Sequence, residues 1–162
     1  GLALDTIFLS RAFEQDDDEL RRGERIATAI ELTLKGEVRI ADLVATKRLP
    51  PPRGGAFQVA TEVIVDNTLS SRFTVLEVSG LDRPGLLYDL TTAIGKLNLN
   101  IGSAHIATFG EKAVDVFYVT DLSGGKITTA SRQNAIKTGL HTVFAPVPGG
   151  VSPVSAKGAR TA

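Results

Sequence analysis

The segment from Lys47 to Gly55, KRLPPPRGG, places the strongest constraint on how this chain can fold. Three consecutive prolines fix their own φ angles and remove three backbone donors, so the segment cannot belong to a helix interior or a central strand. It predicts a stiff linker at about residues 47–57. The 162 residues therefore divide into two small regions rather than forming one continuous pattern.

The region before the linker has the pattern of one strand followed by one helix. Residues Leu4 to Leu9 are β-branched and aromatic enough for a short strand. Asp16 and Glu19 have the spacing of a capping box, which predicts that a helix starts there, and the apolar stripe continues to a helix end near Lys35 and Gly36. The chain begins Gly1-Leu2 without an initiator methionine, so we expect a piece of a longer protein.

Beyond the linker, strand and helix patterns alternate. In order, the sequence predicts strands at 61–65 and 73–78, a helix with apolar positions from Leu86 to Leu97, strands at 101–109 and 113–121, and a helix marked by Ile136, Leu140 and Val143. We place Pro84 in the first turn of the first of these helices and a β-bulge around Gly102 and Ser103.

The order of these elements predicts an α+β fold of the ferredoxin-like kind, an antiparallel sheet with both helices on one face. The strand at 61–65 or a short end strand could complete the sheet, and other α+β sandwiches remain open. Residues 145–162 show no periodicity and are predicted to be a disordered tail.

An internal repeat links the two regions. The segment Ala3 to Leu9 matches Ala113 to Val119 in its alanine and aspartate and, at all but one other position, in apolar character. Each copy precedes a polar turn and an amphipathic helix, so residues 1–67 read as the second half of one unit and residues 72–144 as a complete second unit. The alternative is coincidence between two β-rich strands. A lone strand and helix cannot bury the sheet face they offer, so we expect the first region to pair with other sequence or another molecule.

Composition excludes several classes of function. Eighteen basic and 18 acidic residues leave no net charge to hold a nucleic acid. The absence of cysteine excludes disulfides, thiolate catalysis and cysteine-ligated zinc, which suits a reducing cytoplasm. The apolar runs are too short to span a membrane, and no signal peptide precedes them, so we expect no membrane association.

The most informative motif is a loop between a strand and a helix, residues 81–87, with the sequence Leu81, Asp82, Arg83, Pro84, Gly85, Leu86, Leu87. Free backbone N–H groups at a helix N-terminus, with a glycine that permits close approach, suit a carboxylate ligand. A plain capped turn accounts for the same residues, so the motif alone does not decide.

Further motifs give this loop a context. DRPGLL after a strand, Asn98 to Ile101, the segment AHIAT and a Gly-Glu turn before DVFYVTD resemble the ACT domain, a small-molecule-binding regulatory module. More narrowly, ALDTIF, EVIVDN, SGLDRPGLL and SAHIATFGEKAVDVFYVTD resemble the C-terminal tandem ACT region of the bifunctional PII uridylyltransferase/uridylyl-removing enzymes. The resemblance to a whole ACT domain covers about residues 73–144, and residues 1–67 resemble the latter half of a preceding one.

This resemblance implies a nitrogen sensor. In that enzyme family, upstream domains that use a divalent metal such as Mg²⁺ uridylylate the signalling protein PII and remove the group, while ACT domains bind glutamine and set the balance. It implies no catalytic residue and no cofactor in this piece, and it suggests self-association of ACT modules.

Ligands of ACT domains commonly lie between two modules. Carried over by position, the resemblance points to the loop residues 81–87 and, across the interface, to Asn100 and Ile101. Our hypothesis is that the amides of Gly85 to Leu87 take the amino-acid carboxylate, while Asp82 and Asn100 contact the ammonium or side-chain amide. The first region departs from the family pattern, because it lacks its own loop and first helix here.

Other candidate sites are weaker. His105 and His141 are 36 positions apart without a cysteine partner, so no metal site is expected. The run Ser123 to Lys126 lacks the spacing of a phosphate loop and predicts a turn. Asp5 and Asp115 lie within strands, where we expect them to face solvent or a sheet edge.

Rival functions share the same order of elements. An RNA-binding sheet would need aromatic residues on one face, but Phe117 and Tyr118 are adjacent and point to opposite faces. An acylphosphatase-like enzyme could use Arg83 to hold phosphate, although no general base accompanies it. The serious alternatives are an ACT module of another amino-acid-regulated enzyme, such as an aspartokinase or phosphoglycerate dehydrogenase, and a purely structural dimerisation module.

Overall fold

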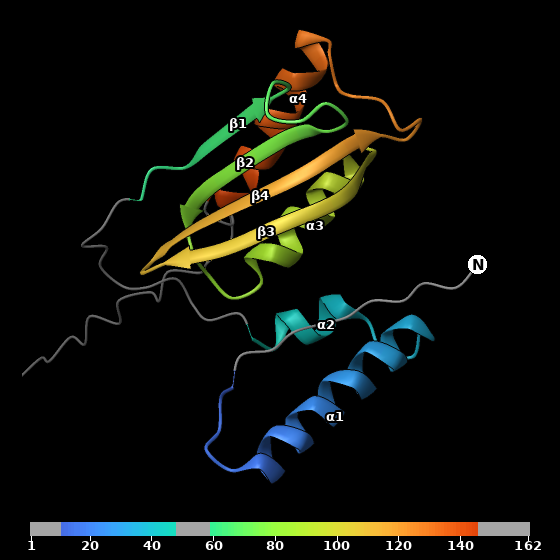
Figure 1. Cartoon of the computed structure of the whole chain (residues 1–162), viewed down its shortest axis with the longest axis vertical. Coiled ribbons are helices and arrows are strands. Elements are labelled where there is room, and N and C mark those ends of the chain that lie inside the picture. The colour runs from blue at the N-terminus through green and yellow to red at the C-terminus, as the bar shows by residue number, and fades with distance from the viewer. Residues whose placement is uncertain (1–10, 48–58, 146–162) are drawn as a thin grey trace, which may run out of the picture. The chain divides into compact units, whose positions relative to one another are not determined.

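The computed structural model describes residues 11–47 and 59–145 (Figure 1). The predicted strand at Leu4–Leu9, most of the linker and nearly all of the predicted tail lie outside the described residues. The chain divides into two compact units, Gly1–Arg48 and Leu49–Ala162. Each is described by itself.

The first unit contains two helices, α1 (Asp16–Leu34) and α2 (Ile40–Ala45). The predicted capping box is wrong in its details, because Gln15 is the N-cap residue and no side chain caps the helix. Glu19 does reach back, but to the backbone amides of Ala12 and Phe13 ahead of the cap. Those two amides lower the pKa of the Glu19 carboxyl. The carboxylate therefore ties the entering chain to the first turn of the helix.

The apolar stripe of α1 remains largely exposed. Neither α1 nor α2 contains a buried residue, and Leu20, Ile30 and Leu34 are 66%, 40% and 83% exposed. A helix whose apolar stripe is exposed gains little stability from burial. The prediction that this region belongs to an incomplete module that needs a covering surface fits this exposure and stays a prediction.

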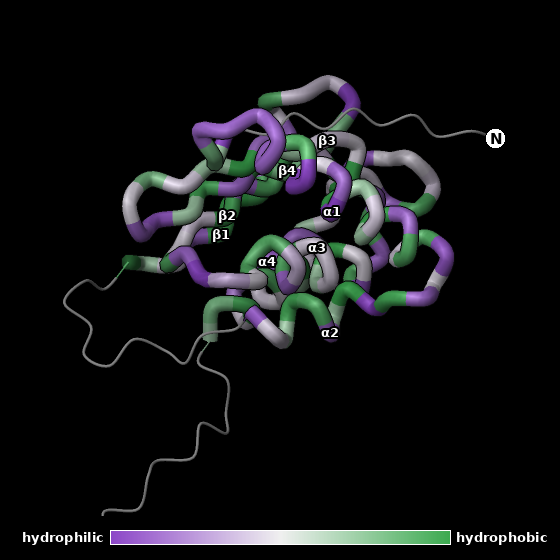
Figure 2. The backbone as a smooth tube through the Cα atoms, turned by 90° about the horizontal axis from the view of Figure 1, so that it is seen from below, coloured by the Kyte–Doolittle hydropathy of each residue, from purple (hydrophilic) through white to green (hydrophobic). Residues whose placement is uncertain are grey.

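The second unit is a four-stranded antiparallel sheet with the order β1-β2-β4-β3. Its elements are β1 (Glu62–Asp66), β2 (Thr74–Leu81), α3 (Leu86–Lys96), β3 (Leu99–Phe109), β4 (Lys112–Asp121), α4 (Ala130–His141) and the 3-10 turn η1 (Thr142–Phe144). Both helices lie on one face of the sheet (Figures 1 and 2). The predicted α+β, ferredoxin-like plan is therefore confirmed, and β1 is the strand that completes the sheet.

Three element boundaries differ from the sequence prediction. Strand β2 continues three residues past Val78 to Leu81. Helix α3 ends at Lys96, and Asn98, with a positive φ of 53°, turns the chain so that β3 begins at Leu99, two residues early. At the end of β2 and at the start of β3, pairing with β4 outweighs the local sequence preference of these residues. The predicted bulge is confirmed by a register shift between Ile101 and Ser103.

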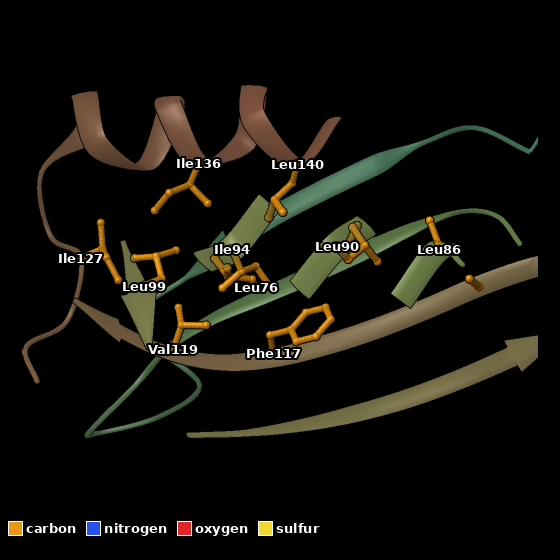
Figure 3. Packing of buried hydrophobic residues seen from close by; sticks show 12 residues of the cluster. Leu76, Leu86, Leu90, Ile94, Leu99, Phe117, Val119, Ile127, Ile136 and Leu140 are labelled. Atoms are coloured by element: carbon orange, nitrogen blue, oxygen red, sulfur yellow. The ribbon is translucent and has the colours of Figure 1, made fainter. Parts of the chain in front are cut away.

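The core lies between the sheet and its two helices (Figure 3). Alternate residues of the two central strands face it, such as Leu76 on β2 and Phe117 on β4, both fully buried. Leu90 and Ile94 approach from α3, and Ile136 with Leu140 from α4. This alternation follows from the two-residue period of a strand whose other face carries no helix.

Phe144, in η1, packs against the C-terminal end of β2. A side chain at Gly80 would overlap the ring of Phe144 in η1, so glycine is required there for close approach. This contact brings η1 to the point where β2 leads toward α3.

We predict that Gly80→Ala lowers the free energy of unfolding by about 1–3 kcal/mol, because the added methyl group overpacks a filled contact. Gly95→Ala, in the last turn of α3 with open space around its Cα, is the matched control, and it should stabilise the chain by up to about 1 kcal/mol. Urea unfolding of both variants checks this. Equal effects of the two substitutions would contradict the packing argument.

Candidate functional site

The loop between β2 and α3 owes its shape to proline and glycine. Pro84 restricts Arg83 to an extended conformation, and Gly85 has a φ of 84°, which residues with a side chain rarely adopt. Gly85 is the N-cap residue and α3 begins at Leu86, so Pro84 precedes the helix rather than lying in its first turn. The chain thus turns sharply from the sheet into the helix.

Asp82 is fixed by the neighbouring β3–β4 hairpin. Its amide donates to the carbonyl of Glu111 at 2.8 Å. One carboxylate oxygen accepts the amide of Arg83 at 2.8 Å, and the other lies 3.4 Å from the hydroxyl of Thr108. The carboxylate is exposed but held in place, which suits a group that contacts a ligand.

Arg83 is committed to holding the loop. Its guanidinium donates to the Asp89 carboxylate at 2.7 Å and to the carbonyl of Val143 in η1 at 3.1 Å. The two contacts join the loop, α3 and η1. Arg83 thus positions the loop, and the same ion pair opposes the phosphate-holding role that an acylphosphatase-like reading would give it.

The amides at the start of α3 are partly available. Leu86 donates its N–H to the carbonyl of Arg83 at 3.0 Å, so this amide does not fit the predicted role of carboxylate donor. Within residues 11–47 and 59–145, no hydrogen bond engages the N–H groups of Gly85 and Leu87. The side chain of Leu86 is buried in the core, whereas Leu87 is 43% exposed. Two donors beside an exposed apolar side chain remain for a ligand carboxylate.

Asn100 and Ile101 lie at the opposite end of the sheet from this loop. Leu81 pairs with Lys112 at one end of the central strands, whereas Ile101 pairs with Val119, opposite Thr74, at the other. The eight residues from Thr74 to Leu81 span roughly 23 Å of extended strand, at about 3.3 Å for each step. A single copy of this unit therefore does not bring the nine predicted site residues together. Only a second module could present Asn100 and Ile101 to the loop.

Asp115 lies on a different face of the sheet from the one its sequence predicted. We expected it to face solvent or an edge, but it is only 3% exposed and lies on the helix-covered face of the central strand β4. It alternates with Ala113 and Phe117, which both belong to the core. Burial raises the pKa of the Asp115 carboxyl; the amide of Ala107 opposes this shift and the nearby charge of Asp82 adds to it. Strand alternation with known core residues was the signal that could have revealed it.

The turn at Ser123–Lys126 and the two histidines, the remaining candidate sites, have structural roles or lie on the surface. Asp121 accepts the hydroxyl of Ser123 at 2.7 Å and the amide of Gly125 at 2.8 Å, so the run Ser123 to Lys126 forms the predicted turn. His105 is exposed on the face without helices and contacts the ring of Tyr118, and His141 ends α4. Among the described helices, none is long and apolar enough to cross a membrane.

The family model described as the ACR family N-terminal ACT domain matches residues 69–145. That range contains β2 to η1, the loop at the start of α3, and the core described above.

Residues 69–145 form an ACT domain.

Longer proteins resemble nearly the whole chain. It is 57% identical over 145 residues to the bifunctional uridylyltransferase/uridylyl-removing enzyme of Bradyrhizobium sp. (strain ORS 278), and 56% identical over 145 residues to that of Bradyrhizobium diazoefficiens. The enzyme of the same name from Nitrobacter winogradskyi is 58% identical over 149 residues. Each match covers 90% of this chain, which spans only 16% of these relatives. The resemblance to this enzyme family, first seen in the motifs, is confirmed.

We predict opposite pH effects for two aspartates in this ACT domain. Asp115 binds its proton more tightly in the folded chain, so its stabilising contribution is complete below the pKa of the unfolded chain and is lost as pH rises through the raised pKa. The free energy of unfolding of Asp115→Asn, minus that of the unsubstituted chain, should therefore increase as pH rises from about 4 to 8.

Asp121 is the control with the opposite sign. The hydroxyl of Ser123 and the amide of Gly125 lower its pKa, so its stabilising contribution is lost as pH falls through that lowered value. For Asp121→Asn, the same difference should decrease as pH rises over the acid range. Urea unfolding at several pH values gives both slopes, and slopes of equal sign would contradict the assignment.

Proposed function

We propose that this chain is an amino-acid-sensing regulatory region that binds glutamine. In this proposal it controls the uridylylation and deuridylylation of the nitrogen-signalling protein PII by catalytic domains of a longer enzyme. The observation that carries it is the 57% identity, over 90% of the chain, to bifunctional uridylyltransferase/uridylyl-removing enzymes. The match of residues 69–145 to an ACT domain supports the sensing role.

The ligand site is proposed to form between two modules. The loop offers the amides of Gly85 and Leu87 for a carboxylate, and the fixed Asp82 for an ammonium group. A second copy of the chain would supply Asn100 and Ile101 across the interface. Strand β3 suits such an interface, since it is an edge strand of 11 residues of which only Leu99 is buried. An exposed edge offers unpaired backbone groups to a partner.

A sensor must hold its loop in a defined state that ligand binding can change. The ion pair of Arg83 with Asp89 and its bond to the carbonyl of Val143 connect the loop to both α3 and η1. A ligand that displaces the loop would therefore act on the end of the described chain. This connection is the route by which binding could reach other domains, given two states with different ligand affinities.

We predict that glutamine, and no other member of a panel containing serine, lysine, threonine and glutamate, raises the melting temperature of the chain. A ligand at about one hundred times its dissociation constant adds roughly 2.7 kcal/mol to the stability of the binding state. Thermal-shift titration with sedimentation velocity measures binding and assembly together. A response to serine, lysine or threonine alone would favour an ACT module of another enzyme. A dimer without any response would favour a structural role.

We predict that Gly85→Ala reduces the affinity for glutamine at least tenfold. The methyl group strains a backbone with positive φ by about 1–2 kcal/mol and shifts the amides that would hold the carboxylate.

Gly124→Ala is the matched control, because Gly124 has a nearly equal φ of 87° in the turn after β4. Both variants should lose similar stability in urea unfolding. Calorimetric titration should show the loss of affinity for Gly85→Ala alone. An unchanged affinity would exclude the loop as the ligand site.

A further inference from the structure

The ACT domain contains a buried carboxylate that the proposed ligand contacts do not use. Asp115 is 3% exposed on the core face of a central strand. Burying an ionised carboxylate costs several kcal/mol unless a partner compensates it. A valine or alanine at this position would satisfy the alternation of β4 without that cost, so packing alone does not explain the aspartate.

The neighbours of Asp115 supply little compensation. Across the sheet it pairs with Val78 on β2 and Ile106 on β3, which are apolar. On its own strand it lies between the core residues Ala113 and Phe117, and Leu86 belongs to the same core from α3. The amide of Ala107 is the favourable group acting on its pKa.

The charged group that acts on Asp115 has the same sign. It is Asp82, in the loop that opens α3, and its charge raises the pKa of Asp115. Arg83, the cation of that loop, is engaged by Asp89. Lys112 lies three positions earlier on β4, at the exposed end of the strand. His105 and Glu77 belong to the opposite face of the sheet by alternation.

Asp82 is also the residue through which the loop is attached to the β3–β4 hairpin. Its carboxylate accepts the Thr108 hydroxyl, and Thr108 pairs with Ala113, two positions from Asp115. A change of charge on Asp115 is therefore felt by the group that fixes the loop. The repeated segment carries aspartate at the corresponding position, Asp5, so both copies retain this carboxylate.

We propose that Asp115 is a positioning residue whose protonation state acts through Asp82 on the loop between β2 and α3. The effect on ligand affinity rests on the proposed function. An ionised Asp115 adds a second negative charge near Asp82, which strengthens the attraction for an ammonium group placed against Asp82. The affinity for glutamine therefore rises with pH as Asp115 loses its proton.

The first test follows the carboxyl carbons and the backbone amides of the labelled chain by NMR from pH 3 to 8. We expect the amides of Asp82 and Arg83 to shift with the same midpoint as the Asp115 carboxyl. Asp115→Asn should remove that midpoint from the loop amides. Asp82→Asn, which leaves the core intact, should lower the Asp115 midpoint. Loop amides without an inflection at the Asp115 midpoint would overturn the proposal.

Glu77→Gln is the matched control, because it neutralises a carboxylate on the opposite face of the same sheet. It should leave the loop inflection and the Asp115 midpoint unchanged. If it abolishes the inflection as Asp115→Asn does, the coupling is a general effect of charge and the proposal fails.

The second test measures the glutamine dissociation constant against pH by calorimetry. The unsubstituted chain should bind about fivefold more tightly above the Asp115 midpoint than below it, and Asp115→Asn should show a flat profile. Binding with no pH dependence overturns the effect on affinity. If glutamine does not bind at any pH, the proposed function fails, and the NMR titration alone then decides whether Asp115 controls the loop.

Discussion

The pairing of β4 with both β2 and β3 is the constraint on which the ACT domain depends. Because β4 is central, its alternate residues must lie under the two helices, and Phe117 and Val119 fill that space. The same register fixes which end of each strand meets the β2–α3 loop. The hairpin that joins β3 to β4 lies beside the loop and holds Asp82. The core, the loop and the buried Asp115 are all consequences of one strand's register.

The loop itself combines local sequence with contacts from distant residues. Pro84 and Gly85 set its backbone, whereas Val143 and Phe144, about 60 residues later, hold it from the other side. Neither part suffices alone. A turn of this sequence without η1 would lose one of the two partners of Arg83 and the ring that packs on Gly80.

The sequence predicted the helices and strands of residues 61–144, the bulge near Gly102 and the family resemblance, because period, turn residues and motifs are local properties. The sequence prediction failed where contacts between residues far apart in the chain determine the structure. The burial of Asp115 depends on which face of β4 the helices cover. Whether the amide of Leu86 is free for a ligand or bonded to the carbonyl of Arg83 depends on where α3 starts. The prediction that Asn100 and Ile101 lie across an interface from the loop is consistent with the antiparallel register, which places them at the other end of the sheet, and it stays a prediction.

Strand β1 lies at the sheet edge beside β2, and it comes from the sequence before the rest of the domain. The described chain after residue 58 therefore enters the sheet through an edge strand whose five residues pair with β2. A pulling force applied to the chain at Glu62 would act first on these five pairs. The force would pass next to β2, which ends at the β2–α3 loop. A pulling force on β1 would thus reach the β2–α3 loop through a single strand.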